Sequence, residues 1–274
     1  AANKITSIAI HDSVTDQYWC FVLDEQNKLK PNDWGKNVTV ETFDKEYGLL
    51  QRFYAKYLEM RPTIITGWNV DGFDIPYLYN RSQQVVGKNI ADCLSPISKI
   101  YYNKYRERYM IAGVSCLDYL MLYKNFTFSS KPSYRLDDIG KDEVGTSKIS
   151  YEGTLNDLYE NHLEDFVKYN IHDVRIVKKL DDKLDFIDVA RGICHVGHVP
   201  YEDIVYDSRF LEGAILVYLK KLGVVAPNKT PRDDVKKDGK FTGAYVQDPQ
   251  KGRHDWVYDL DITSMYPSII MSLN

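Results

Sequence analysis

The chain has 274 residues, of which 44% are hydrophobic and 27% charged, and its formal net charge is -4. These proportions are those of a folded globular protein, so they exclude a disordered or low-complexity chain. No apolar run approaches the roughly 20 residues that a membrane span requires, and no secretory signal opens the sequence. The four cysteines form no CxxC pair, which favours reduced thiols. We therefore expect a soluble, cytoplasmic protein without a membrane partner.

The first part of the chain has the element order of an α/β domain. Residues 4–11 and 18–23 are rich in β-branched and aromatic residues and flank a polar turn, which predicts a hairpin. Asp44 is a candidate cap for a helix that Pro62 ends. A short buried strand over residues 63–67 follows at once. This order of strand, helix and strand indicates an α/β sheet.

The rest of the chain combines a hairpin, several helices and a linker. Residues 99–111 are aromatic and basic and predict an extended surface hairpin. Apolar residues at helical spacing then predict helices over residues 117–125, 154–170, 173–193 and 211–222. The polar stretch 227–240 contains two prolines and is the best linker candidate. Strand character returns at 241–246 and 256–262, so a second domain is expected to begin there.

Two segments of the first domain carry residues suited to chemistry. Asn69, Phe73 and Asp74 lie where an apolar strand feeds a helix, and α/β folds gather functional groups at such places. A helix cap explains Asp74 equally well. Tyr169 and Asp173 are four residues apart, so on a helix they share one face. A solvated helix face explains that spacing equally well, and the residues alone leave both alternatives open.

The third segment lies near the end of the chain. An apolar strand delivers Asp261 to a helix that begins at Thr263 or Ser264, with Pro267 in its first turn. Backbone N–H groups at a helix start favour phosphate, and a neighbouring carboxylate can hold Mg²⁺ that bridges to phosphate oxygens. The segment therefore predicts a site for a metal and a nucleotide.

Residues 261–270, Asp-Ile-Thr-Ser-Met-Tyr-Pro-Ser-Ile-Ile, resemble palm motif A of the family B DNA polymerases, DxxSLYPSII, with Met265 in place of leucine. The two earlier segments resemble the second and third proofreading motifs of that family. Residues 241–246 resemble the YxGG-like segment between exonuclease and polymerase, with Phe241 for tyrosine and Ala244 for the second glycine. The resemblance covers essentially the whole chain and is strongest to the replicative polymerases of T-even-like bacteriophages.

The resemblance implies an α/β fold, with a ribonuclease-H-like exonuclease domain, a mixed sheet flanked by helices, followed by the beginning of a polymerase palm. Residues 1–185 would form the exonuclease domain, 186–232 a helical connecting segment and linker, and 233–274 the start of the palm. The family's DxE motif and its later paired-aspartate motif have no equivalent in the sequence. We therefore expect an internal fragment that is weak or inactive by itself.

The resemblance also implies cofactors and catalytic roles. Each active site of the complete enzyme would hold two Mg²⁺ ions, or alternatively Mn²⁺. In the proofreading site, Asp74 and Asp173 would bind the metals, and Tyr169 would orient the attacking water or the scissile phosphate. In the palm, Asp261 and the Ile262 carbonyl would be metal ligands.

The implied partners are primer–template DNA, the single-stranded primer end and dNTPs, together with a sliding clamp and other replisome proteins. Ser264 and Met265 would bind the triphosphate through backbone amides, and Tyr266 would be the steric gate against ribonucleotides. The implied location is the cytoplasm, that of the host cell if the protein is viral. The implied DNA contacts are Asn69, Phe73, Tyr105, Arg106, Arg108, Gly243, Ala244 and Tyr245.

Two other functions are compatible with parts of the sequence. A stand-alone 3′–5′ exonuclease would share the same sheet but would have no use for the nucleotide site at Asp261. A non-catalytic nucleic-acid-binding module would explain the 22 tyrosines and the missing carboxylates. It would leave the three motifs in family order without an explanation.

Overall fold

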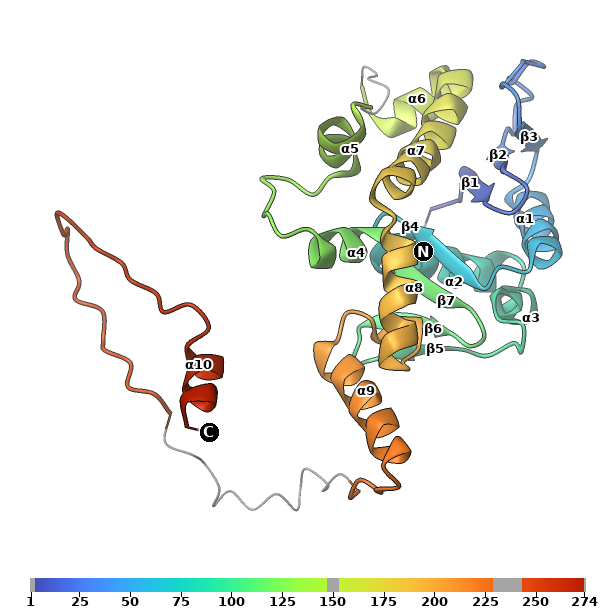
Figure 1. Cartoon of the computed structure of the whole chain (residues 1–274). Helices are drawn as coiled ribbons and strands as arrows, with labels where there is room; N and C mark the ends of the chain where they lie inside the picture. The colour runs from blue at the N-terminus through green and yellow to red at the C-terminus, as the bar shows by residue number, and fades with distance from the viewer. Residues whose placement is uncertain (1–2, 147–152, 229–242, 274) are drawn as a thin grey trace. The chain divides into compact units, whose positions relative to one another are not determined.

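The structure, a computed structural model, describes residues 3–146, 153–228 and 243–273. The chain divides into two units, residues 1–226 and residues 227–274 (Figure 1). Across the described ranges, none of the helices combines the length and apolar character needed to cross a membrane. The predicted division at residues 185 and 232 stays a prediction.

The first unit begins with a three-stranded sheet packed between two helices. β2 lies in the centre, antiparallel to β1 and parallel to β3. Alternate residues of β2 face opposite layers, because side chains along a strand alternate between the two faces. Phe21 and Leu23 pack in the core beside α1, whereas Cys20 and Val22 pack beside α7. These elements are β1 (Ser7–Asp12), β2 (Gln17–Leu23), β3 (Val38–Phe43), α1 (Glu46–Met60) and α7 (Leu163–Leu184).

A second, two-stranded sheet holds two strand-to-helix turns side by side. β4 (Ile64–Gly67) and β7 (Ser115–Asp118) are parallel, and Gly67 is paired with Asp118 at their carboxyl ends. β4 continues through a π-helical turn, Val70–Asp74, into α2 (Ile75–Val85), and β7 continues directly into α4 (Tyr119–Phe126). Polar residues that follow the two strands therefore meet at one edge of this sheet.

A separate hairpin and a group of helices complete the first unit. The helix α7 links two cores, because Phe166 and Val167 pack on the first sheet and Ile176 and Leu180 pack against α4, α5 and α8. The remaining elements are α3 (Lys88–Ala91), β5 (Ile100–Asn103), β6 (Arg108–Ile111), α5 (Leu136–Val144), α6 (Leu155–Asn161), α8 (Phe186–Gly197) and α9 (Asp207–Lys221).

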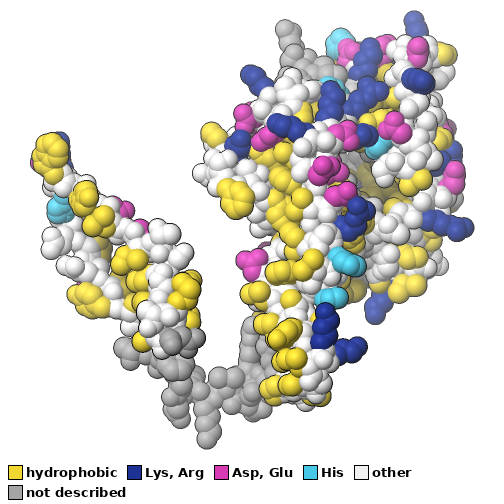
Figure 2. Space-filling view, viewed as in Figure 1, with side chains coloured by type: hydrophobic (Ala, Val, Ile, Leu, Met, Phe, Trp, Pro, Cys, Tyr) yellow, Lys and Arg dark blue, Asp and Glu magenta, His cyan; other side chains and the backbone are white. Residues whose placement is uncertain are grey.

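The helices α8 and α9 cross at two glycines. A Cβ atom on Gly213 would lie 2.1 Å from the Gly197 carbonyl oxygen, so the crossing leaves no room for a side chain. Figure 2 shows hydrophobic side chains running along α8 and α9, and Val196, Leu211 and Ile215 are each more than half exposed. On the same face, Lys and Arg side chains alternate with Asp and Glu over the upper part of this unit.

The second unit differs from its prediction. Over residues 243–273 the structure has one regular element, α10 (Met265–Ser272), and no strand, although residues 256–262 were expected to form one. A strand needs a neighbour for its backbone hydrogen bonds, and the described part of this unit offers none. The helix start is confirmed, because Ser264 is the residue before α10 and Pro267 lies in the first turn. Residues 241 and 242 and most of the linker lie outside the described residues.

Several element predictions for the first unit need correction. Asp44 does not cap α1, because the helix begins after Lys45. The expected long helices break where His162 ends α6 and where Asp185 takes a left-handed conformation between α7 and α8. The strand near residue 65 is partly rather than fully buried. The hairpins at β1–β2 and β5–β6 are confirmed, whereas β3, β7 and α5 were missed.

Candidate active site

The turn that follows β4 is held in place by Asp118, a residue that the sequence patterns did not single out. The Asp118 carboxylate is 5% exposed and accepts hydrogen bonds from the backbone N–H groups of Asn69 (3.0 Å), Asp71 (3.2 Å) and Leu120 (3.0 Å). One side chain thus caps α4 and fixes the neighbouring turn, because the parallel strands end together. Burial raises the pKa of Asp118, and the backbone donors oppose that shift. The sequence signal that could have identified Asp118 is its position at the end of an apolar strand that leads into a helix. Asn69 and Asp74 were noted for the same kind of position.

The geometry of this turn depends on Asn69 and Gly72. Asn69 has a left-handed backbone with φ of 64°, a conformation that asparagine tolerates better than most residues. A Cβ atom on Gly72 would lie 2.5 Å from the Asn69 Oδ1 atom. The Asn69 side chain therefore packs beneath Gly72 and supports the turn from within.

Asp74 ends the turn but does not act as a helix cap. It precedes α2 and makes no side-chain capping hydrogen bond, which removes the structural explanation that the sequence left open. The side chain keeps access to solvent, yet protein atoms surround it closely, and this desolvation raises the pKa of Asp74 to about 6. Phe73 is 59% exposed and its ring stacks on Tyr77, with centroids 5.6 Å apart. The turn thus presents a carboxylate beside a stacked aromatic pair of which Phe73 is exposed and Tyr77 is partly buried.

The raised pKa of Asp74 makes a prediction about stability. Its pKa in the unfolded chain is near 3.8. The folded protein therefore gains stability from a proton on Asp74 at low pH, and this gain is lost as the pH rises through about 6. Without divalent metal, Asp74→Asn should raise the Tm at pH 7.5 by roughly 1–3 °C, a small effect because the side chain is partly solvated.

Thermal melts at pH 7.5 and pH 4.0 measure this effect. The difference between Asp74→Asn and the unaltered chain should shrink at pH 4.0, where a proton neutralises Asp74 in the folded protein. An equal difference at both pH values would contradict the assignment. Asp188→Asn is the matched control, since Asp188 is exposed and paired with Arg191 on α8.

Tyr169 and Asp173 lie on α7, one turn apart and both partly buried. Their partial burial argues against a purely solvated helix face. Beside them, the Asn170 amide donates a hydrogen bond of 2.6 Å to the Ser7 hydroxyl, which ties this part of α7 to β1. The Val70–Asp74 turn packs instead on β6, β7 and α2. Asp74 and Asp173 are therefore supplied by elements that pack on different sheets.

The described residues do not form a complete metal site. They contain no group of three or more His, Cys, Asp or Glu side chains placed to hold an ion. Carboxylates such as Asp74 and Asp173 are the ligands that Mg²⁺ prefers, but a pair of ions needs more negative charge than two of them supply. The donor chemistry fits a divalent metal, and the ligand number is short of what such a site requires.

The hairpin places its predicted DNA contacts in two different environments. Tyr105 is at the tip and 82% exposed. Arg106 instead forms an ion pair with Asp203, and Arg108 forms one with Asp71 in which the two charged atoms are 2.6 Å apart. Both arginine side chains are largely buried. Their guanidinium groups thus bind other parts of the chain, while the tyrosine faces solvent.

The predicted palm residues are all exposed within the second unit. Asp261 and Ile262 precede the helix, and Met265 and Tyr266 begin it. The first N–H groups of a helix have no intrahelical partner, and this holds for those at the start of α10. Gly243, Ala244 and Tyr245 lie in the extended segment that follows the linker, and Tyr245 is 89% exposed.

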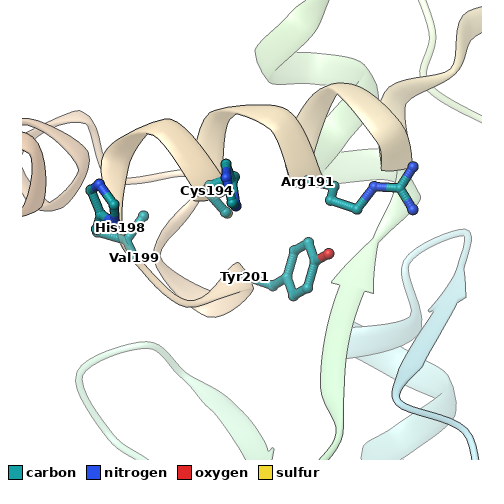
Figure 3. Close-up of a pocket in the computed structure, with 6 residues that line it drawn as sticks. Arg191, Cys194, His198, Val199 and Tyr201 are labelled. Carbon is teal, nitrogen blue, oxygen red and sulfur yellow. The ribbon is translucent and has the colours of Figure 1, made fainter.

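A cavity of about 420 Å³ lies elsewhere, along α8 and the segment after it (Figure 3). No carboxylate lines it, so it cannot supply the oxygen ligands of a magnesium site. The cavity is therefore not the candidate active site, which is formed by the turn after β4. The lining residues are Arg191, Cys194, His195, His198, Val199 and Tyr201.

Two family models match this chain. The exonuclease domain of DNA polymerase family B matches residues 6–139, and DNA polymerase family B matches residues 206–274. The first range contains the turn with Asp74, and the second contains Asp261 and α10. The chain belongs to the family B DNA polymerases, which confirms the resemblance seen in its motifs.

The relatives include two phage enzymes. The chain is 32% identical over 300 residues to the DNA-directed DNA polymerase of Enterobacteria phage T4 and 30% identical over 300 residues to that of Escherichia phage RB69. Both alignments cover 100% of this chain and 33% of the relative, so the chain spans about one third of their length. The DNA polymerase 1 of Saccharolobus solfataricus is 28% identical over 267 residues, which cover 86% of this chain and 28% of that protein.

Proposed function

We propose that this chain supplies the 3′–5′ proofreading site and the first palm motif of a replicative DNA polymerase that copies a template from dNTPs. The observation that carries the proposal is Asp74, which ends a turn pinned by Asp118 inside the region matched by the exonuclease model. Among the described residues, its carboxylate neither caps a helix nor forms an ion pair. Asp261, before α10, adds the carboxylate of the second activity.

The arrangement of the strands supports a ribonuclease-H-like fold for the first unit. The mixed sheet β1–β2–β3 and the parallel pair β4–β7 are flanked by helices. Within the described residues, β1 and β4 are edge strands. A strand carrying the family's DxE pair could bind to either edge, because an edge strand presents unpaired backbone groups. Such a strand would bring two further carboxylates toward Asp74 and Asp173.

In the proposed exonuclease reaction, Asp74 and Asp173 would hold divalent ions together with the DxE pair. Bound ions of this kind activate a water and stabilise the leaving 3′-oxygen. Tyr169, one helical turn from Asp173, would position the water or the scissile phosphate through its hydroxyl group. Phe73, exposed and stacked on Tyr77, would support the last unpaired base, since base stacking on aromatic side chains contributes about 1–3 kcal/mol.

In the proposed palm, Asp261 and the Ile262 carbonyl would bind the catalytic metals. The N–H groups at the start of α10 would bind the triphosphate, and the Tyr266 ring would exclude a 2′-hydroxyl. Exposed Tyr105 would contact single-stranded DNA at the hairpin tip. Phosphate contacts by Arg106 and Arg108 stay predictions, as do a sliding clamp, other replisome proteins and a cytoplasmic location.

A primer-extension assay of the full-length enzyme tests the proposal. With Mg²⁺ and dNTPs, a matched primer should be extended, and a primer with a mismatched 3′ end should first be shortened. Without dNTPs, the primer should be degraded from its 3′ end. The 274-residue chain by itself should do neither at a comparable rate. Failure of the full-length enzyme to incorporate dNTPs, or degradation from the 5′ end, would refute the proposal.

A further inference from the structure

A buried ion pair connects the hairpin to the turn that carries Asp74. Arg108, in β6, donates one hydrogen bond from Nη1 to Asp71 Oδ2 (2.6 Å) and another from Nη2 to the Glu202 carbonyl (3.0 Å). The side chains of Arg108 and Asp71 are 15% and 13% exposed. Charges so shielded from water interact strongly, and loss of one partner leaves the other buried without compensation.

The position of Asp71 makes this ion pair relevant to the site. Asp71 lies three residues before Asp74 within the same turn, and its backbone N–H is bound by Asp118. The turn is therefore held from two directions, by Asp118 through its backbone and by Arg108 through the Asp71 side chain. A movement of β6 would act on the turn through this second contact.

Arg106 provides a natural comparison in the same hairpin. Its guanidinium pairs with Asp203 and donates to the Glu202 carbonyl, and neither contact involves the Val70–Asp74 turn. Both arginines thus fasten the hairpin to the segment after α8. Of the two residues, Arg106 pairs with Asp203 and lies over the Tyr206 ring, whereas Arg108 reaches the turn through Asp71.

Some polar atoms of this ion pair have no hydrogen-bond partner among the residues described. Within the described part of the chain, Arg108 Nε and Asp71 Oδ1 are buried and have no hydrogen-bond partner. Buried polar groups in native proteins are nearly always paired, and an incompletely paired one calls for an explanation other than stability. An ion pair with unpaired buried atoms contributes less to stability than a fully hydrogen-bonded one.

We propose that Arg108 and Asp71 are positioning residues that make the placement of Asp74 depend on the docking of the hairpin. With the hairpin docked, the ion pair keeps the turn in the geometry described. Displacement of the hairpin, for example by a DNA strand held at Tyr105, breaks the pair and loosens the turn. The effect on catalysis rests on the proposed exonuclease function. The effect of the ion pair on the turn can be tested without an activity assay.

Hydrogen exchange of the 274-residue chain tests the structural part. Arg108→Met should speed exchange of the Asn69–Asp74 amides by about tenfold or more, because these amides then open locally. Arg108→Lys keeps the charge and should restore most of the protection. Arg106→Met should speed exchange near Asp203 and affect the turn much less than Arg108→Met does, because the Arg108–Asp71 pair remains. Asp71→Asn combined with Arg108→Met should add little to either single change, since both remove the same contact.

A second arm measures single-strand hydrolysis by the full-length enzyme. Arg108→Met should lower kcat by about tenfold with little change in KM, the signature of a misplaced catalytic group. Unchanged protection of the turn in Arg108→Met, or equal loosening by Arg106→Met, would overturn the proposal. An enzyme without any exonuclease activity would refute the proposed function alone, because the exchange experiment would still report on the ion pair. If Arg108→Met fails to fold, Asp71→Asn and Arg108→Lys serve in both arms.

Discussion

Asp74→Asn in the full-length enzyme should reduce 3′–5′ hydrolysis by about 10²–10³-fold while primer extension stays within about twofold, because the change removes charge stabilisation at one site only. Asp261→Asn should have the opposite effect. It should abolish dNTP incorporation and preserve hydrolysis of single-stranded DNA. The two carboxylates belong to different units of the chain, which is the structural reason to expect separate effects.

Steady-state assays on single-stranded DNA and on matched primer–template DNA measure both activities for each variant. Two nearby carboxylates serve as matched controls. Asp259→Asn changes an exposed residue two positions before Asp261, and Asp182→Asn changes a residue on α7 that pairs with Lys178 at the surface. Both controls should keep both activities. Loss of both activities in Asp74→Asn, with normal folding, would contradict separate sites.

The sequence predicted those parts of the fold that depend on local patterns. β2 was predicted from its β-branched and aromatic residues, and both of its faces are packed, Phe21 and Leu23 on one and Cys20 and Val22 on the other. The β5–β6 hairpin followed from its aromatic and basic composition. β3 was missed although Val38 and Val40 alternate with Thr39 and Glu41, because its parallel pairing with β2 is not a local property.

The site could be predicted only as separate pieces. Asp74, Tyr169 and Asp173 were recognised by motif, but which elements support them depends on tertiary pairing. Asp118 reaches Asn69 across 49 sequence positions, and Arg108 reaches Asp71 across 37. The family resemblance implied DNA contacts at Arg106 and Arg108, whereas the structure shows both arginines engaged in internal ion pairs. A sequence pattern reports that a charge is present and does not report which partner it meets.

Asp118→Ala should be among the most destabilising single changes in the first unit. It removes a helix cap and leaves the N–H groups of Asn69 and Asp71 without their acceptor. Loss of a cap costs about 1 kcal/mol and each buried unsatisfied donor about 1–3 kcal/mol, so we expect a total of about 2–4 kcal/mol after partial rescue by water. The Tm should fall by roughly 5–15 °C.

Denaturant or thermal unfolding of the 274-residue chain measures this loss, and two further variants define its cause. Asp118→Asn keeps one acceptor oxygen and should lose less than half as much stability as the alanine variant. Asp188→Ala removes an exposed carboxylate on α8 and should change stability by no more than about 0.5 kcal/mol. If the alanine and asparagine variants lost equal stability, the two carboxylate oxygens of Asp118 would not act as separate acceptors. Because Asp118 holds the turn and not the ions, its loss should lower exonuclease activity in proportion to the loosening of residues 69–74, while Asp74→Asn should remove activity and leave the fold intact.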